Sequence, residues 1–313
     1  MNNYSLDNIF GLQNRKLYMG ISILWIICYH FYLVTQSFFD ENLYFLKLLF
    51  RNGYVGVDVF FILSFYGLCC SLERSSIRKY YKKRFFRIIP IYVIFLVVCK
   101  FLLHIDKGFF YDSFLQMSSL SIFNTQFTKP VSMGGEWFVP AIINLYIVFP
   151  IIYKVIKLIL NKYSYGGYVV IILSILSTEF LRDYISPNYV VRFPIIVCGV
   201  LTYLYLKKGD YKKLCHVYFL MIIFAFIMVR TNVILSLIVP IVLKYLNDMD
   251  FKSDNRLLDF CGTISFELYL SHVIPMNFCS DKNILHSFAI MFFGTLILCF
   301  VFVKVNSLVR KFN

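Results

Sequence analysis

Charged residues are scarce in this sequence. Asp, Glu, Lys and Arg together make up 15% of its 313 residues, whereas about 25% of the residues of a soluble domain are charged. Hydrophobic residues make up 59% of the chain, and the mean hydropathy is +0.71. This composition excludes a soluble globular protein, a disordered chain and a small secreted domain held by disulfides. We therefore expect a multi-pass integral membrane protein.

Several sequence signals are also missing. The nine cysteines lie mostly inside apolar runs and form no pair of C-x-x-C motifs, so we predict buried thiols and no metal site. No small-residue cleavage site follows the first apolar run, which favours a retained span over a signal peptide. We find no internal repeat and no low-complexity tract, and therefore expect a single integral membrane domain over residues 1–313.

The apolar runs are long and continuous instead of alternating, which indicates helices and not the strands of a barrel. The predicted fold is an all-α, polytopic bundle of about ten transmembrane helices. The expected spans lie near 17–36, 53–72, 88–104, 137–160, 166–181, 189–206, 216–230, 231–246, 257–279 and 284–303.

The net charge of +14 is distributed unevenly between the connecting segments. With a cytoplasmic N-terminus, the inside segments carry 22 Lys and Arg residues and the outside segments carry 8. The positive-inside rule and the even number of expected spans therefore predict that both termini lie in the cytoplasm. The abundance of Ile, Lys, Asn, Phe and Tyr is typical of an AT-rich bacterial genome, so we expect a bacterial cytoplasmic membrane. Because the basic residues flank apolar spans instead of forming one stripe, we do not expect nucleic acid as a partner.

Five ionisable residues occur inside or beside predicted spans, where their cost usually implies a function. They are His30, Asp58, Glu136, Arg192 and His272. The helical rise places the two histidines and the aspartate about 8–10 Å below the outer surface, with the other two nearer to it. A histidine beside a carboxylate is the arrangement that general-base chemistry requires. Each residue alone is equally compatible with a structural role.

A second polar feature is the segment 73–90, which we expect to be a cytoplasmic loop. It contains seven basic residues and one acid. Positive-inside charge or contact with anionic lipid explains this equally well. The functional alternative is a site for a phosphate-bearing cytosolic ligand, because Arg84 and Arg87 share one helical face and guanidinium suits phosphate.

Six segments together resemble, in order, the signature blocks of the membrane-bound acyltransferase family 3. They read MGISILWIICYHF, GYVGVDVFFILSFYG, YYKKRFFRIIP, EWFVPAIINLYIVFP, RFPIIVCG and GTISFELYLSHVIP. That family includes bacterial O-acetyltransferases of capsule, lipopolysaccharide, peptidoglycan and Nod-factor sugars. The resemblance implies transfer of an acyl group, usually acetyl, from cytosolic acyl-CoA to a carbohydrate hydroxyl.

The resemblance also implies roles for particular residues. His30 matches the essential histidine of the family's first span, and Arg84 and Arg87 match its R-x-x-R motif. The late block of the family corresponds to Gly262, Ser265, Tyr269 and His272. The chain departs from the pattern at Met19, where the family often has arginine; Arg15 or Lys16 is a candidate substitute one turn away.

Our mechanistic hypothesis follows from these two sets of residues. Arg84 and Arg87 bind the diphosphate of acetyl-CoA or another acyl-CoA, and His30 acts as general base or carries the acyl group. Asp58 or Glu136 orients the imidazole. The acceptor is the sugar of a surface polysaccharide or of a lipid-linked glycan. The remaining candidates contact this sugar or the developing oxyanion. They are Trp137, Arg192, Ser265, Tyr269 and His272.

Two other functions remain open at this point. A transporter or sugar-lipid flippase would use His30, Asp58 and His272 as a proton relay. A polysaccharide polymerase would use the same group on lipid-linked sugars. The transporter or flippase does not explain the basic segment with Arg84 and Arg87, and the sequence contains no inverted repeat to support it.

Overall fold

The structure is a computed structural model that describes residues 14–104, 108–123, 137–227, 255–280 and 282–311. Within these ranges the chain is helical and forms no strand, apart from an isolated bridge between Phe123 and Ile185. The helices of the first half are α2 (Arg15–Val34), α3 (Gln36–Asn42), α4 (Tyr44–Arg51), α5 (Val55–Arg74), α6 (Ile77–Leu102), α7 (Phe109–Met117) and the short 3-10 helix η2 (Leu120–Ile122). Those of the second half are α8 (Phe138–Lys162), α9 (Gly166–Leu181), α10 (Pro187–Val190), α11 (Phe193–Lys208), α12 (Tyr211–Ile227), α14 (Arg256–Thr263), α15 (Ser265–Met276) and α16 (Ile284–Lys311).

The expectation of an all-helical membrane bundle is confirmed. Among the described residues, six segments are long and apolar enough to cross a membrane, and a bent pair of helices would make a seventh. The six are Arg15–Val34, Tyr44–Arg74, Ile77–Leu102, Phe138–Lys162, Asn188–Lys208 and Ile284–Val309. Helix α9 is apolar but shorter, and the expected span at 231–246 lies outside the described residues. The number ten therefore stays a prediction.

The segment 73–90 is not a loop, which corrects the sequence-based expectation. Helix α6 begins at Ile77, directly after its N-cap Ser76, and continues through Pro90 into the apolar span. Lysine, arginine and aromatic side chains are all compatible with a helix, so hydropathy alone misplaced the boundary. Arg84 and Arg87 consequently lie on the first turns of one continuous helix.

The predicted span 257–279 is also interrupted. Helix α14 ends at Thr263, and α15 leaves Ile264 at an angle of 78° to it. No proline marks this break, and the apolar residues continue across it, so the hydropathy pattern contains no signal for the bend. The bend allows α14 and α15 to contact α2 at two different levels.

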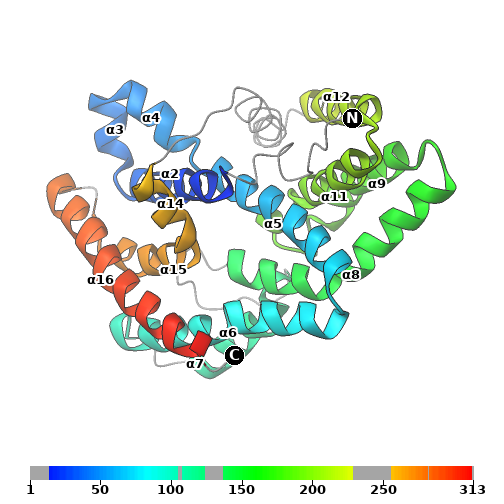
Figure 1. The fold of residues 1–313 in the computed structure, drawn as a ribbon. Helices are drawn as coiled ribbons and strands as arrows, with labels where there is room; N and C mark the ends of the chain where they lie inside the picture. Colours follow the sequence, from blue (N-terminus) through cyan, green and yellow to red (C-terminus); the bar gives the residue numbers. More distant parts are fainter. Residues whose placement is uncertain (1–13, 105–107, 124–136, 228–254, 281, 312–313) are drawn as a thin grey trace.

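Helix α2 lies near the middle of the molecule and packs against α5, α14 and α15 (Figure 1). Helix α16 lies on one side of this group and contacts α15 and α6, while α9 and α12 lie on the other side around α11. The apolar stretch of the span containing α11 is 89% buried inside the protein, whereas that of α16 is 22% buried. Helix α11 is thus an inner helix, and α16 presents most of its surface outward.

Two glycines allow α2 and α14 to touch backbone to backbone. A Cβ atom on Gly20 would lie 2.0 Å from the carbonyl oxygen of Leu258, and one on Gly262 would lie 1.8 Å from that of Lys16. Small residues at such crossings are typical of helix packing in membranes, where close backbone approach replaces the hydrophobic effect. This contact fixes the bent pair α14–α15 against the first span.

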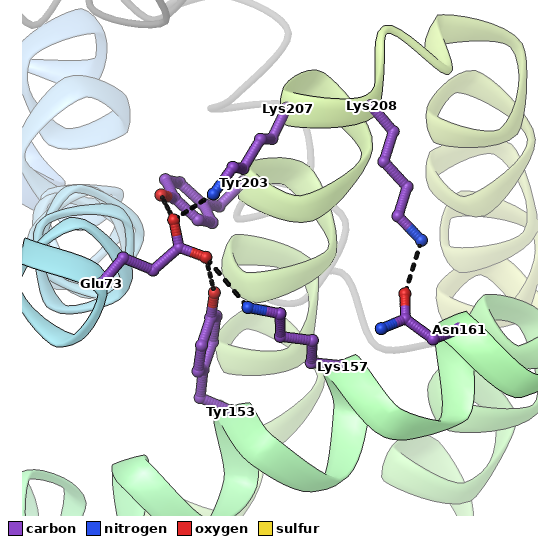
Figure 2. Close-up of polar contacts among 7 residues, drawn as sticks. All are labelled: Glu73, Tyr153, Lys157, Asn161, Tyr203, Lys207 and Lys208. Carbon is purple, nitrogen blue, oxygen red and sulfur yellow. Dashed lines mark hydrogen bonds and ion pairs between the residues drawn. The ribbon is translucent and has the colours of Figure 1, made fainter.

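One carboxylate joins three helices at the end of the bundle where the basic residues gather. Glu73 of α5 accepts hydrogen bonds from Tyr153 of α8 at 2.6 Å and from Tyr203 of α11 at 2.7 Å. It also forms ion pairs with Lys157, at 3.2 Å, and with Lys207 (Figure 2). We call these five residues the Glu73 cluster and the end of the bundle that they occupy the basic end.

Candidate active site

The two intramembrane histidines meet, although 242 residues separate them in the sequence. His30 lies on α2 and His272 on α15, and their rings are 4.9 Å apart between centroids. The Nδ1 atom of His30 lies 3.1 Å from the Nε2 atom of His272. The bend between α14 and α15 produces this contact, because it directs α15 toward the C-terminal half of α2.

The neighbouring carbonyl groups assign the tautomers of this pair. The Nδ1 atom of His30 faces the carbonyl oxygen of Ile26 at 3.1 Å, and that of His272 faces the carbonyl oxygen of Leu268 at 3.3 Å. A carbonyl oxygen only accepts, so each neutral ring carries its proton on Nδ1. The single Nδ1–H of His30 is then shared between the carbonyl oxygen of Ile26 and the Nε2 atom of His272. The Nε2 atom of His30 keeps a lone pair and has no hydrogen-bond partner among the described residues.

A large cavity lies beside the histidine pair, toward the C-terminal end of α2. Its volume is about 480 Å³, within the range of small-molecule sites. Tyr29 and Tyr54 line it, and the ring of Tyr29 lies 5.3 Å from that of His30. One aromatic side chain therefore separates the cavity from the imidazole.

A buried ion pair forms part of the wall of the large cavity. The Nε atom of Arg192 donates to Asp58 at 2.8 Å, and its Nη1 atom donates to the carbonyl oxygen of Asn188 at 2.5 Å. Trp137 covers the guanidinium, whose carbon lies 4.6 Å from the indole centroid. Both charged side chains are less than 10% exposed. An ion pair so well bonded provides a rigid polar wall.

A second, narrower pocket of about 40 Å³ lies nearer the basic end. Arg87 lines one part of it, and Ser265 and Tyr269 of α15 line another. The ring of Tyr269 lies 5.3 Å from the ring of His272. Each pocket is thus lined by an aromatic residue that contacts one member of the histidine pair: Tyr29 beside His30 in the large cavity and Tyr269 beside His272 in the narrow pocket.

Three arginines gather at the basic end of the narrow pocket. The guanidinium of Arg15, at the start of α2, lies close enough to those of Arg84 and Arg87 to be repelled by both. The Nε atoms of Arg15 and Arg84 are buried without a hydrogen-bond partner among the described residues. Like charges with unsatisfied buried donors are costly unless an anion compensates them. We call these three residues the arginine cluster.

The predicted site residues thus fall into separate groups. The structure pairs His30 with His272, pairs Asp58 with Arg192 and Trp137, and places Ser265 and Tyr269 beside the narrow pocket. Asp58 does not orient His30 in the structure. The hydrogen-bond partners of His30 within the described chain are Ile26 and His272. The other proposed orienting group, Glu136, lies outside the described residues.

Sequence reasoning missed several residues of the site. Tyr29 and Tyr54 line the large cavity, as do Lys47 and Arg51 of α4, a helix within a segment interpreted only as an outer connection. Tyr29 precedes His30, and Tyr54 lies one turn before Asp58, so helical spacing from the predicted residues was an available signal. Arg15, named only as a possible substitute at the Met19 position, proves to neighbour Arg84 and Arg87.

A buried acid on α15 also escaped the sequence analysis. Glu267 is 4% exposed and accepts a hydrogen bond from Asn306 of α16. The contact joins the helix that carries His272 to the last span. Within the described ranges, no three His, Cys, Asp or Glu side chains are arranged to hold a metal ion, and each of the nine cysteines is a free thiol.

The fold and these pockets define a class: a multi-pass helical membrane protein with a histidine pair between a large cavity of about 480 Å³ and a narrow pocket of about 40 Å³. The model of one family, described as an acyltransferase domain, matches residues 20–304. The chain belongs to this family, acyltransferase family 3, as its sequence blocks predicted. No curated protein and no solved structure matches the chain.

Proposed function

We propose that the protein is a membrane O-acyltransferase that moves an acyl group, in the first instance acetyl, from cytosolic acyl-CoA to a hydroxyl of a surface or lipid-linked carbohydrate. The observation that carries this proposal is the arrangement of the two pockets. The narrow pocket comes within one aromatic ring, that of Tyr269, of His272 from the arginine-rich end, and the large cavity comes within one ring, that of Tyr29, of His30 from the far end of α2. A two-substrate reaction needs such convergence of donor and acceptor on one base.

The arginine cluster supports the donor side of the proposal. Three guanidinium groups suit the phosphates of coenzyme A, since each forms paired hydrogen bonds to phosphate oxygens. Arg87 belongs both to this cluster and to the lining of the narrow pocket, so a bound donor would extend its acyl arm from there toward Tyr269. Met19 also lines the pocket, and its flexible side chain would move aside to admit the arm.

In the proposed reaction, the Nε2 atom of His30 takes the proton of the sugar hydroxyl. The hydroxyl oxygen attacks the thioester carbonyl, an O–C bond forms, and the C–S bond breaks. The thiolate of coenzyme A leaves and takes up the proton that His30 removed from the hydroxyl. The products are therefore a sugar ester and coenzyme A with a free thiol. His272 stabilises the charged His30 by accepting its Nδ1–H, the role that a carboxylate fills in many hydrolases.

The remaining candidates take supporting roles in this proposal. Ser265 and Tyr269 lie where a hydroxyl donor would face the carbonyl oxygen of the arriving thioester. Arg192 forms part of the wall against which the sugar would lie, and Trp137 stacks on its guanidinium. Asp58 holds Arg192 in place and does not act on the imidazole.

A flippase remains the second candidate on one observation, since His30, Asp58 and Arg192 lie in candidate membrane spans and His272 lies in the bent pair of apolar helices. Asp58 is, however, bonded to Arg192, and the histidines bond to each other. The described contacts therefore form two separate groups instead of one relay.

The test uses purified full-length protein in lipid nanodiscs with radiolabelled acetyl-CoA and an extract of cell-surface glycan. We expect labelled glycan and an equal amount of free thiol, and we expect neither from His30→Ala. Arg84→Ala with Arg87→Ala should weaken acetyl-CoA binding by at least tenfold, while Lys282→Ala, an exposed residue outside both pockets, serves as control. Glycan labelling at the wild-type level in His30→Ala would remove the catalytic role.

A further inference from the structure

Helix α6 presents the basic residues of its first turns on two different faces. Arg84 and Arg87 face the inside of the bundle: the guanidinium carbon of Arg84 lies 5.5 Å from the ring centroid of Tyr146 on α8, and Arg87 lines the narrow pocket. The other four basic residues of these turns are exposed; they are Arg78, Lys79, Lys82 and Lys83. We call these four residues the outer basic face of α6.

The outer basic face has no ion-pair partner within the described ranges. None of its four side chains lies in an ion pair there. Helix α6 itself contains no Asp or Glu. The acid nearest to it in the sequence, Glu73, is already paired with Lys157 and Lys207. Four positive charges are therefore available to an anion from outside the bundle.

Helix α6 leads this face directly into the lipid. The helix continues without a break to Leu102 along the outside of the bundle (Figure 1), and only 33% of its apolar stretch is buried inside the protein. A single helix therefore carries the four cations and a surface that faces acyl chains.

Exposed apolar side chains place the outer basic face at the membrane interface. Ile77, Tyr81 and Phe85 recur every four residues beside the cations and are 51%, 39% and 54% exposed. Such a mixture of cations with aromatic and aliphatic side chains is typical of the interface. By the helical rise, the four cations lie about 3–10 Å before Phe85, which overlaps the headgroup region of one leaflet, about 5–8 Å thick.

We propose that the outer basic face of α6 binds the phosphate groups of anionic phospholipids in the leaflet at the basic end. The occupant is lipid because the face continues into the lipid-exposed side of the same helix, and because four or more cations directly before a span suit an anionic membrane surface. This contact holds the start of the helix that carries Arg84 and Arg87 at the level of the headgroups. The inference does not depend on acyl transfer.

Native mass spectrometry of the purified full-length protein measures the lipid preference. The protein is mixed with equal amounts of dioleoyl phosphatidylglycerol and dioleoyl phosphatidylcholine, whose acyl chains are identical, so that a difference reports the headgroup alone. We expect about tenfold more bound phosphatidylglycerol than phosphatidylcholine at about 0.1 M ammonium acetate. The preference should shrink at about 0.5 M, because salt screens exposed charges.

Two variants with the same net charge locate the preference. The first neutralises the outer basic face and should reduce the preference at least threefold; its changes are Arg78→Gln, Lys79→Gln, Lys82→Gln and Lys83→Gln. The matched control neutralises four exposed lysines of α8, α11 and α12 and should keep most of the preference; its changes are Lys154→Gln, Lys162→Gln, Lys208→Gln and Lys212→Gln.

Two further variants separate charge from fold and the outer face from the inner one. Replacement of the three lysines of the outer basic face by arginine keeps the charge and should keep the preference. Arg84→Ala with Arg87→Ala should keep it as well, because these two side chains face the inside. Thermal unfolding of each variant is the folding control.

Three outcomes would overturn the inference. The first is equal binding of the two lipids by the wild-type protein. The second is an equal loss of preference in the outer-face variant and in its matched control. The third is a loss in Arg84→Ala with Arg87→Ala as large as that in the outer-face variant.

Discussion

At the scale of single residues, the proposed chemistry depends on which nitrogen of His30 is free. Two carbonyl oxygens on the helices that carry the imidazoles determine this, since each requires a proton on Nδ1. The arrangement resembles a base held by an orienting partner, but the partner is His272 and not a carboxylate. His272 is fully buried, so it acts through His30 and not on a substrate.

The role of His272 as a positioning residue predicts a graded loss. His272→Ala should lower kcat about 100-fold, and His272→Gln less, because a glutamine oxygen can still accept the Nδ1–H of His30. KM for acetyl-CoA should stay the same, since the arginine cluster is untouched. A larger change in KM than in kcat, or equal kcat for the two variants, would contradict this role.

The buried pair of Asp58 and Arg192 predicts a large and non-additive effect on stability. Asp58→Asn leaves the guanidinium buried without its counter-charge, which should cost about 3–5 kcal/mol. Asp58→Asn combined with Arg192→Met removes both charges and should be more stable than Asp58→Asn alone. Thermal unfolding in detergent measures the stability of Asp58→Asn, of Arg192→Met and of the double variant. If the losses of stability in the two single variants simply add up in the double variant, the pairing is contradicted.

At the scale of helices, the backbone contact between α2 and α14 orders the site. Gly262→Ala places a methyl group where the carbonyl group of Lys16 now lies, so the two helices must separate. We expect a destabilisation of about 1–3 kcal/mol, as for other overpacked contacts, together with lower activity because α15 follows α14. Gly67→Ala is the matched control, since its nearest neighbour would be at 3.5 Å. Equal stability of both variants would rule out the close crossing.

The Glu73 cluster predicts different effects for two adjacent lysines. Lys207 pairs with Glu73, whereas Lys208 donates to the neutral Oδ1 atom of Asn161 at 2.9 Å (Figure 2). Lys207→Gln should therefore destabilise the protein by about 1 kcal/mol, and Lys208→Gln by less than about 0.5 kcal/mol. Glu73→Gln should exceed both, because two tyrosines and two lysines lose a charged acceptor. Equal unfolding temperatures for the two lysine variants would contradict the cluster.

The apolar runs gave most helices correctly, and the failures have physical reasons. The range 166–181 matches α9 residue for residue, because its apolar run has clear ends. The start of α6 at Ile77 was missed because a basic segment has low hydropathy yet good helical propensity. The bend at Ile264 was missed because tertiary contact with α2, and not a local signal, accompanies it.

For the site, as for the helices, the sequence predicted positions along each helix but not the contacts between helices. Depth along a span predicted His30 and His272 as site residues, since intramembrane ionisable groups are rare, and the structure brings their two rings together. Depth alone does not indicate which way a side chain points around the helix axis. The sequence therefore did not reveal that the histidines pair together, or that Asp58 turns toward Arg192 instead.

At the scale of the whole molecule, the basic residues of distant segments gather at one end. The arginine cluster and the Glu73 cluster join the ends of α2, α5, α6, α8 and α11. The positive-inside rule predicts that this end faces the cytosol, the side from which the proposed acyl-CoA donor would bind. The large cavity lies about 20 Å further along α2, judged by the helical rise from Arg15 to Tyr29.

The central claim is that donor and acceptor reach His30 from opposite sides of the membrane. Its most direct test uses proteoliposomes with uniformly oriented protein, acetyl-CoA on the side of the arginine cluster and glycan acceptor confined to the other side. We predict that acetylated glycan accumulates on the acceptor side, and that His30→Ala abolishes it. Acetylation only when both substrates share one side would contradict the account.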